Sequence, residues 1–145
     1  MRSRILFISG HPDDARRLSR MLQTLALWVD RVETLQQARA KLQQDDYCVI
    51  LTEAALPDGK WPDALHLARQ CPREPEVIVT DPQADARFWA EALNLGAYDL
   101  LAQPFYEPEV RRILFNACSR VGQYAMGAAA GSGGPSGPER EKSAA

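Results

Sequence analysis

The stretch YCVILTEAALPDG, Tyr47–Gly59, places an apolar strand directly before a turn. The apolar residues VIL at 49–51, followed by the turn residues LPDG at 56–59, predict a short buried strand that ends in a loop. Glu53 lies at that strand end. In an open sheet of parallel strands, ligands bind outside the carboxyl ends of the strands. The carboxylate of Glu53 is therefore the first candidate for a functional group.

The strand before Glu53 is one of five that alternate with helical patterns. The expected strands are Ile5–Ile8, a short segment around Arg31–Glu33, Tyr47–Thr52, Glu76–Thr80 and Tyr98–Ala102. Parallel strands need helical crossovers, so five such units predict a flavodoxin-like (βα)5 domain. We expect a doubly wound parallel sheet of order 2-1-3-4-5 in three α/β/α layers. The domain is expected to span residues 1–121.

Capping and breaking residues place the helices between these strands. Asp13 or Asp14 is expected to cap the first helix, whose apolar positions continue at helical spacing to Val29. Gly96 is expected to end the fourth helix, because glycine adopts the left-handed conformation common at helix ends. Pro108 suits the first turn of the last helix.

Composition and charge exclude several classes of function. The chain of 145 residues is 46% hydrophobic and 25% charged, which fits one globular domain. A net charge of -2 offers no basic field for nucleic acid, and no apolar run is long enough for a signal peptide or a membrane span. Residues 122–145 lose periodicity and become rich in Gly, Ala, Ser and Pro, so a flexible tail is expected there.

The three cysteines, Cys48, Cys71 and Cys118, are an odd number without metal-ligand spacing. They predict neither a disulfide framework nor a zinc cluster. Cys48 and Cys118 fall on apolar stripes and are interpreted as small core residues. A reducing, cytoplasmic setting is therefore expected.

Several segments together resemble the receiver domains of two-component response regulators. They are LPDG at 56–59, VIVT ending at Thr80, and GAYDLLAQPF at 96–105, and the resemblance covers residues 4–121. It implies a domain that accepts a phosphoryl group from a histidine kinase. The acceptor would be an aspartate at the end of the third strand, and an acidic pair after the first strand would hold Mg²⁺.

This chain departs from that pattern at most of the positions that would carry the chemistry. The changed positions are Ser9 and Gly10 for the acidic pair, Glu53 for the phosphoacceptor, Leu100 for an aromatic switch residue and Gln103 for a lysine. Thr80 keeps its family identity. These departures imply a degenerate site, or pseudo-receiver, and no enzymatic activity.

The losses can be weighed physically, because phosphoryl transfer rests on positioning and on neutralisation of charge. Glu53 is the only obvious carboxylate left at the strand ends, so Mg²⁺ binding is expected to be weak or absent. Glutamate also extends one methylene farther than aspartate, and a misplacement of about 1 Å can cost about a hundredfold in rate. We expect Glu53 to accept hydrogen bonds from the Thr80 hydroxyl and the Gln103 amide instead.

Other interpretations of these residues stay open. Glu53 or a nearby aspartate could still be phosphorylated, or Glu53 could supply the permanent negative charge of a phosphorylated aspartate. The plainest alternative is a solvated carboxylate with no role, since loops often carry charged residues. Asp58 and Asp81 are interpreted as turn acids rather than as substitute acceptors.

The string GHPDD, residues 10–14, resembles the zinc-binding signature of the LmbE/PIG-L type deacetylases. That resemblance implies a metal hydrolase that uses His11, Asp13 and Asp14. Catalytic zinc needs three protein ligands, yet the only other histidine, His66, lies within an expected helix. His11 is therefore interpreted as a loop residue, and no metal is expected.

Trp89, Tyr98 and Tyr106 fall on or near the fourth helix and fifth strand. The receiver resemblance implies that this face binds partners, and aromatic residues are enriched at binding hot spots. We expect a signalling protein as partner, or a homodimer through the fourth helix, fifth strand and fifth helix. Ordinary packing is the alternative for Trp89. Nucleic acid and membrane are not expected as direct partners.

Overall fold

A computed structural model describes residues 3–130 of the chain, and their side chains over residues 3–119. The strands are β1 (Arg4–Ile8), β2 (Trp28–Val32), β3 (Val49–Glu53), β4 (Ala55–Leu56), β5 (Gly59–Lys60), β6 (Glu76–Asp81) and β7 (Asp99–Ala102). The helices are α1 (Pro12–Leu22), the short 3-10 helix η1 (Gln23–Leu25), α2 (Leu35–Gln44), α3 (Trp61–Arg69), α4 (Ala86–Leu95) and α5 (Glu107–Ala130).

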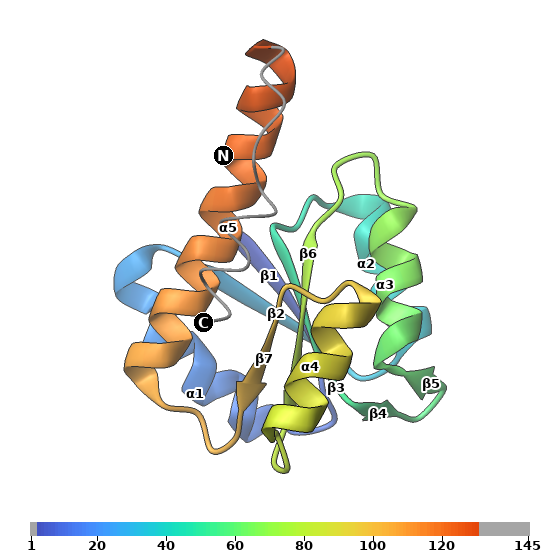
Figure 1. Ribbon diagram of the computed structural model, residues 1–145, viewed down its shortest axis with the longest axis vertical. Coiled ribbons are helices and arrows are strands. Elements are labelled where there is room, and N and C mark those ends of the chain that lie inside the picture. The colour runs from blue at the N-terminus through green and yellow to red at the C-terminus, as the bar shows by residue number, and fades with distance from the viewer. Residues whose placement is uncertain (1–2, 131–145) are drawn as a thin grey trace.

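The five long strands form one parallel sheet in the order β2-β1-β3-β6-β7. Helices α1 and α5 cover one face of this sheet, and α2, α3 and α4 cover the other (Figure 1). The expected flavodoxin-like architecture and strand order are therefore confirmed, with β6 and β7 as the fourth and fifth strands of the sheet. Strand β3 pairs with β1 on one side and with β6 on the other, so it is the central strand.

Two hydrophobic cores lie on the two faces of the sheet. Alternate residues of β1 divide between them: Ile5 and Phe7 pack with α1 and α5, whereas Leu6 and Ile8 pack with α2 and α3. All four are fully buried. Burial of side chains of this size contributes about 1.5–3 kcal/mol each. A continuous apolar strand is thus the expected pattern for a sheet with both faces covered.

The first helix is shorter than its apolar spacing predicts. It ends at Leu22, a 3-10 turn follows, and Ala26 reverses the chain in the left-handed conformation with φ 55°. Val29, which the spacing placed on this helix, lies in β2. Strand β2 begins at Trp28 rather than near Arg31, and it was hard to recognise because this edge strand leaves its first residue 63% exposed.

A small antiparallel hairpin, β4 with β5, follows the central strand and was not expected. Its turn contains Asp58, whose carboxylate accepts hydrogen bonds from the backbone N–H groups of Leu35 (2.9 Å) and Gln36 (3.1 Å) at the start of α2. These bonds hold the pKa of the Asp58 carboxyl below its ordinary value. The Asp58 carboxylate therefore caps the start of α2 from a segment that is distant in the sequence. At Gly59 a Cβ would meet Asp63 Oδ2 and Leu35 Cδ1 at 2.5 Å, so a side chain there would force a rearrangement.

Asp85, Gly96 and Pro108 mark three helix ends, of which Gly96 and Pro108 were expected from the sequence. Asp85 accepts a hydrogen bond from the Phe88 N–H at the start of α4, and Gly96 ends that helix with φ 115°. Pro108 is the second residue of α5. This helix continues through Ala130, past the domain boundary that composition placed at 121–122. The remainder of the predicted tail, 131–145, lies outside the described residues.

A disulfide joins Cys48, beside β3, to Cys118 on α5. Both cysteines were expected in the core, and both lie there. They belong to the core between the sheet and α5, and Cys48 is fully buried. The expectation of no disulfide is wrong for this pair. Cys71 is not part of a disulfide. Over residues 3–130 no helix is long and apolar enough to cross a membrane.

Reduction of the Cys48–Cys118 bond is expected to destabilise the domain. The bond closes a loop over a sequence separation of 70, and this restriction of the unfolded chain corresponds to about 4 kcal/mol. Urea unfolding followed by tryptophan fluorescence, with and without dithiothreitol, measures the difference. The variant Cys71→Ser should show the same difference. Three titratable thiols in the unfolded, unreduced chain, rather than one, would contradict the pairing.

Candidate functional site

Glu53 ends the central strand at the edge of the sheet where the carboxyl ends of the strands meet. In the parallel register it stands opposite Thr80 of β6, while Thr52 stands opposite Ile8 of β1. The residue after Ile8 is Ser9, which is fully buried and whose N–H donates to the Val32 carbonyl of β2 (2.8 Å). The neighbouring strand ends therefore bring Ser9 and Glu53 together.

The Glu53 carboxylate is held by groups from the loop that follows β1. The Ser9 hydroxyl donates to Glu53 Oε2 (2.5 Å), and His11 Nδ1 lies 2.8 Å from the same oxygen. The Gly10 N–H donates a longer bond of 3.4 Å to Oε1. The same Ser9 hydroxyl oxygen accepts a hydrogen bond from the His11 backbone N–H (2.9 Å), so the Ser9 side chain links the loop to Glu53. The Glu53 side chain is only 17% exposed.

The expected partners of Glu53 were wrong, although a hydrogen-bonded carboxylate was expected. The Thr80 hydroxyl donates instead to the Leu101 carbonyl of β7 (2.8 Å). Thr80 is almost fully buried, and a neighbouring strand carbonyl is the nearer acceptor for its hydroxyl. The Gln103 backbone N–H donates to the Asp81 carbonyl (3.3 Å), and its peptide bond to Pro104 is cis. Among residues 3–119, neither Thr80 nor Gln103 bonds to Glu53.

His11 and the two aspartates after it are arranged differently from the prediction. His11, not Asp13 or Asp14, is the residue that caps α1, and its side chain makes no cap hydrogen bond. Both aspartates lie in the first turn of the helix, where Asp13 pairs with Arg16 and Asp14 with Arg17 (3.5 Å). Pro12 occupies the first helical position, which its missing N–H suits, and this shifts the cap to the preceding residue.

The geometry raises the pKa of His11 above its ordinary value. The hydrogen bond to Glu53 is the largest cause, and the charge of Glu53 adds to it. His11 is 70% exposed, so solvent screens this pair. Sequence reasoning assigned His11 to the loop and missed its role. The adjacency of the first and third strands, which places residues 9–11 beside position 53, was the signal that could have found it.

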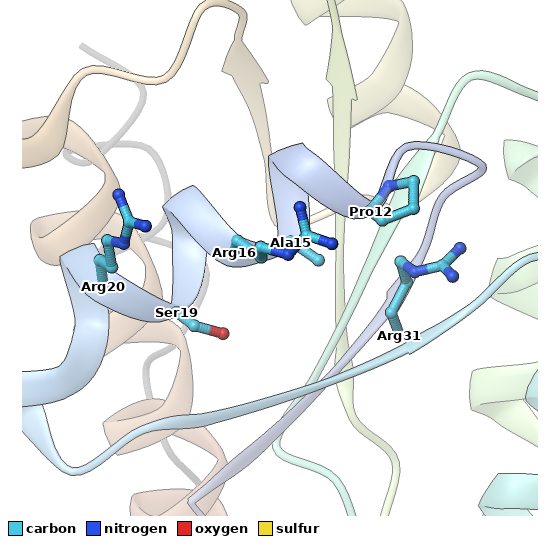
Figure 2. A pocket seen from close by; sticks show the side chains of 6 residues that line it. All are labelled: Pro12, Ala15, Arg16, Ser19, Arg20 and Arg31. Carbon is cyan, nitrogen blue, oxygen red and sulfur yellow. The ribbon is translucent and has the colours of Figure 1, made fainter.

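Gly10 and Arg31 complete the surroundings of this site. Gly10 is exposed, with nothing within 4 Å of the position its Cβ would take. Arg31 of β2 donates from Nη1 to the Ser9 carbonyl (2.9 Å) and lies 3.4 Å from Glu33. It also borders an open hollow of about 430 Å³ beside α1, whose other lining residues are labelled in Figure 2. The hollow lies along the flank of α1, and Glu53 does not line it.

The residues proposed for the partner face differ in exposure. Tyr106, just before α5, is 66% exposed, whereas Trp89 and Tyr98 are half-buried. The Trp89 indole N–H donates to Asp99 Oδ1 (3.0 Å), which supports the packing interpretation of Trp89. Burial raises the pKa of the Asp99 carboxyl, and the bonds from the Leu100 N–H and Trp89 partly oppose this. Leu100 is buried.

Comparison with known proteins agrees with this fold. The chain is 25% identical over 117 residues to the response regulator protein PilR of Pseudomonas aeruginosa. That alignment covers 80% of this chain but 26% of the relative, so the chain spans about a quarter of that protein. The beryllofluoride-activated NtrC4 receiver domain dimer has a TM-score of 0.73 at 22% identity, covering 82% of this chain and 98% of that one.

The receiver domain of the sensor histidine kinase PA1611 from Pseudomonas aeruginosa PAO1 is also similar. It has a TM-score of 0.67 at 25% identity, with 82% of this chain and 99% of that chain covered. Its structure has a magnesium ion coordinated in the active-site cleft. The model of the response regulator receiver domain family matches residues 5–115. With the sheet order and the strand-end site described above, the match shows that this chain belongs to the response regulator receiver domain family of two-component signalling.

Proposed function

We propose that this receiver domain signals through a phosphorylation-independent interaction and has no catalytic activity of its own. The observation that carries the proposal is the set of hydrogen bonds on Glu53. Its Oε2 atom already has the Ser9 hydroxyl and His11 Nδ1 as close partners. A carboxylate whose oxygens are engaged in this way is part of the structure and a poor nucleophile.

The residues at this site do not fit the magnesium ion that the family implies. Mg²⁺ requires nearly octahedral oxygen ligands and binds through one or two carboxylates. Here Ser9 and Gly10 follow β1, Ser9 is buried and its hydroxyl is used on Glu53, and the imidazole of His11 occupies the adjacent space. No phosphoryl-transfer step through Mg²⁺ is therefore assigned to this chain.

The groups that would respond to a phosphoryl group are also altered. Gln103 brings no positive charge to the site, so a transferred phosphoryl group would lack the lysine charge that the family pattern supplies at this position. The Thr80 hydroxyl is bonded to the Leu101 carbonyl, and the buried Leu100 stands where a switching aromatic would be expected. Without that lysine and without a switching aromatic side chain, negative charge at Glu53 would not be transmitted to the rest of the domain. This favours fixed structure over mimicry of phosphorylation.

We infer that output passes through the surface formed by α4, β7 and the start of α5, in the cytoplasm. Tyr106 is the exposed aromatic residue on this surface that best suits a partner. The partner is a signalling protein or a second copy of this chain. In a reducing cytoplasm the Cys48–Cys118 pair would be maintained as thiols, because cytosolic disulfides are rare.

Beryllofluoride with Mg²⁺ is expected to leave the amide NMR spectrum unchanged around Glu53, Thr80 and Gln103. The reason is that Ser9 and Gly10 replace the acidic pair, and Gln103 the lysine, that hold such a phosphoryl analogue in the family. The NtrC4 receiver domain, which beryllofluoride activates, is a suitable positive control under identical conditions. Saturable shifts localised at these residues would establish a working receiver instead.

The pair of His11 with Glu53 predicts a pH dependence. The pKa of His11 is raised, so its contribution to stability is fully present below about pH 6.5 and is lost as the pH rises through the raised value. The substitution Glu53→Gln should lower the pKa of His11, measured by NMR titration of its ring protons. Asp13→Asn, which changes an exposed neighbouring charge, should leave it unchanged. An equal pKa in wild type and Glu53→Gln would refute the pairing.

The substitution Tyr106→Ser is expected to weaken self-association or partner binding at least tenfold if this surface is the interface. Loss of a large exposed aromatic side chain from an interface removes a typical hot spot. Sedimentation velocity over a range of concentrations measures self-association. Trp28→Ser is a matched control, because Trp28 is similarly exposed (63% against 66%) but lies on the edge strand β2. Equal effects of both substitutions would argue against the surface.

A further inference from the structure

Three potential metal ligands converge at the same strand end. His11, Asp14 and Glu53 each offer a ligand atom, and these atoms all lie within 4.8 Å of one another. Two come from the cap and first turn of α1, and the third from the end of β3. Glu53 lies about forty residues after the other two in the sequence, but the pairing of β1 with β3 brings the three together.

The distances are close to those that a bound metal requires. Zinc binds imidazole nitrogen and carboxylate oxygen at about 2.0–2.2 Å, so tetrahedral ligands lie about 3.3 Å apart. His11 Nδ1 and Glu53 Oε2 are 2.8 Å apart and would separate slightly. Since all pairs lie within 4.8 Å, no pair would have to close by more than about 1.5 Å, and rotation of the Asp14 side chain about its χ angles is a movement of this size.

The chemistry of the ligand set selects the ion. One imidazole and two carboxylates match zinc and related transition ions, whereas Mg²⁺ prefers oxygen ligands alone. Three protein ligands with one open position is the arrangement that zinc adopts in sites open to solvent or substrate. The two carboxylates also offset the double positive charge of the ion. This set differs from the acidic pair of the family, since Ser9 and Gly10 occupy those positions and cannot supply it.

Neighbouring groups support the ligands. The Ser9 hydroxyl donates to Glu53 and accepts from the His11 N–H, so one buried side chain orients both ligand-bearing segments. Supporting hydrogen bonds of this kind tune metal affinity in known sites. Two effects oppose binding: Arg17 lies 3.5 Å from Asp14, and the start of a helix disfavours cations. The Arg17 side chain of this pair is 62% exposed, so solvent screens it and it is a weak competitor.

We propose that His11, Asp14 and Glu53 form a site for a divalent transition ion, with Zn²⁺ as the preferred occupant. The ion would connect the loop after β1, the first turn of α1 and the end of β3, and would fix that corner of the domain. The proposal does not depend on the absence of phosphorylation. The beryllofluoride and zinc experiments use different probes, and each can fail without the other.

Isothermal titration of the metal-free chain with ZnCl₂ tests the site. We expect one Zn²⁺ per chain with an affinity at least a hundredfold above that for MgCl₂. His11→Ala and Asp14→Asn should each lower the zinc affinity at least tenfold. Substitution of Co²⁺ for zinc should give the visible absorption of a low-coordinate site, and His11→Ala should abolish it. Circular dichroism in EDTA verifies that each variant is folded.

The chain offers matched controls for each ligand. His66→Ala removes the other histidine, which is exposed on α3, and Asp13→Asn removes the neighbouring acid. Cys71→Ser removes the cysteine outside the disulfide. All three should bind zinc as the wild type does. No zinc binding above that of Mg²⁺, an unchanged affinity in His11→Ala, or a loss in His66→Ala or Cys71→Ser would overturn the proposal.

Discussion

The position of β3 in the middle of the sheet is the constraint on which the rest of the molecule depends. Its backbone is paired on both sides, and its residues from Val49 to Thr52 are fully buried between two helical layers. Such a strand cannot slip by one residue without moving its side chains to the opposite face. The end of the strand is therefore fixed, and whatever stands at position 53 is presented at the same point.

The order of the strands decides which segments reach that point. Strand β1 lies between β2 and β3, so the loop after β1 borders the end of the central strand. Ser9 and His11 on this loop become the partners of Glu53, while Thr80 on the other side bonds to β7. The carboxylate thus turns toward the first strand. One additional methylene lets glutamate reach this loop, which a shorter aspartate side chain would reach less easily.

Patterns with a short period were predictable from the sequence, and pairings across long separations were not. The apolar runs of β1, β3 and β6 and the glycine stop at Gly96 were identified with small errors at their boundaries. The edge strand β2 was displaced because Trp28 is exposed and the alternation is weak. Asp58 looked like a turn acid because its partners, the N–H groups that begin α2, lie 22 and 23 residues away.

The same limit applies to the site and to the cysteines. The sequence identified position 53 and the absence of the acidic pair, but it assigned the hydrogen bonds to Thr80 and Gln103. Thr80 lies on the strand next to β3 and Gln103 follows the strand beyond it, so choosing between them and Ser9 requires the direction of the Glu53 side chain. Cys48 and Cys118 were correctly assigned to the core. Their pairing over a separation of 70 could not be deduced, because spacing alone does not give disulfide connectivity.

The departures from the receiver pattern are best understood as one coupled set. Aspartates at positions 9 and 10 beside Glu53 would place like charges together at a partly buried strand end, and only a metal ion could relieve that repulsion. Serine at position 9 removes one charge and adds a donor, and His11 adds a second donor that can be positively charged. The donors at Ser9 and His11 stabilise the Glu53 carboxylate, and the carboxylate in turn gives both donors an acceptor. A single reversion at position 53 would leave the loop donors in place, so aspartate alone would not rebuild a phosphorylation site.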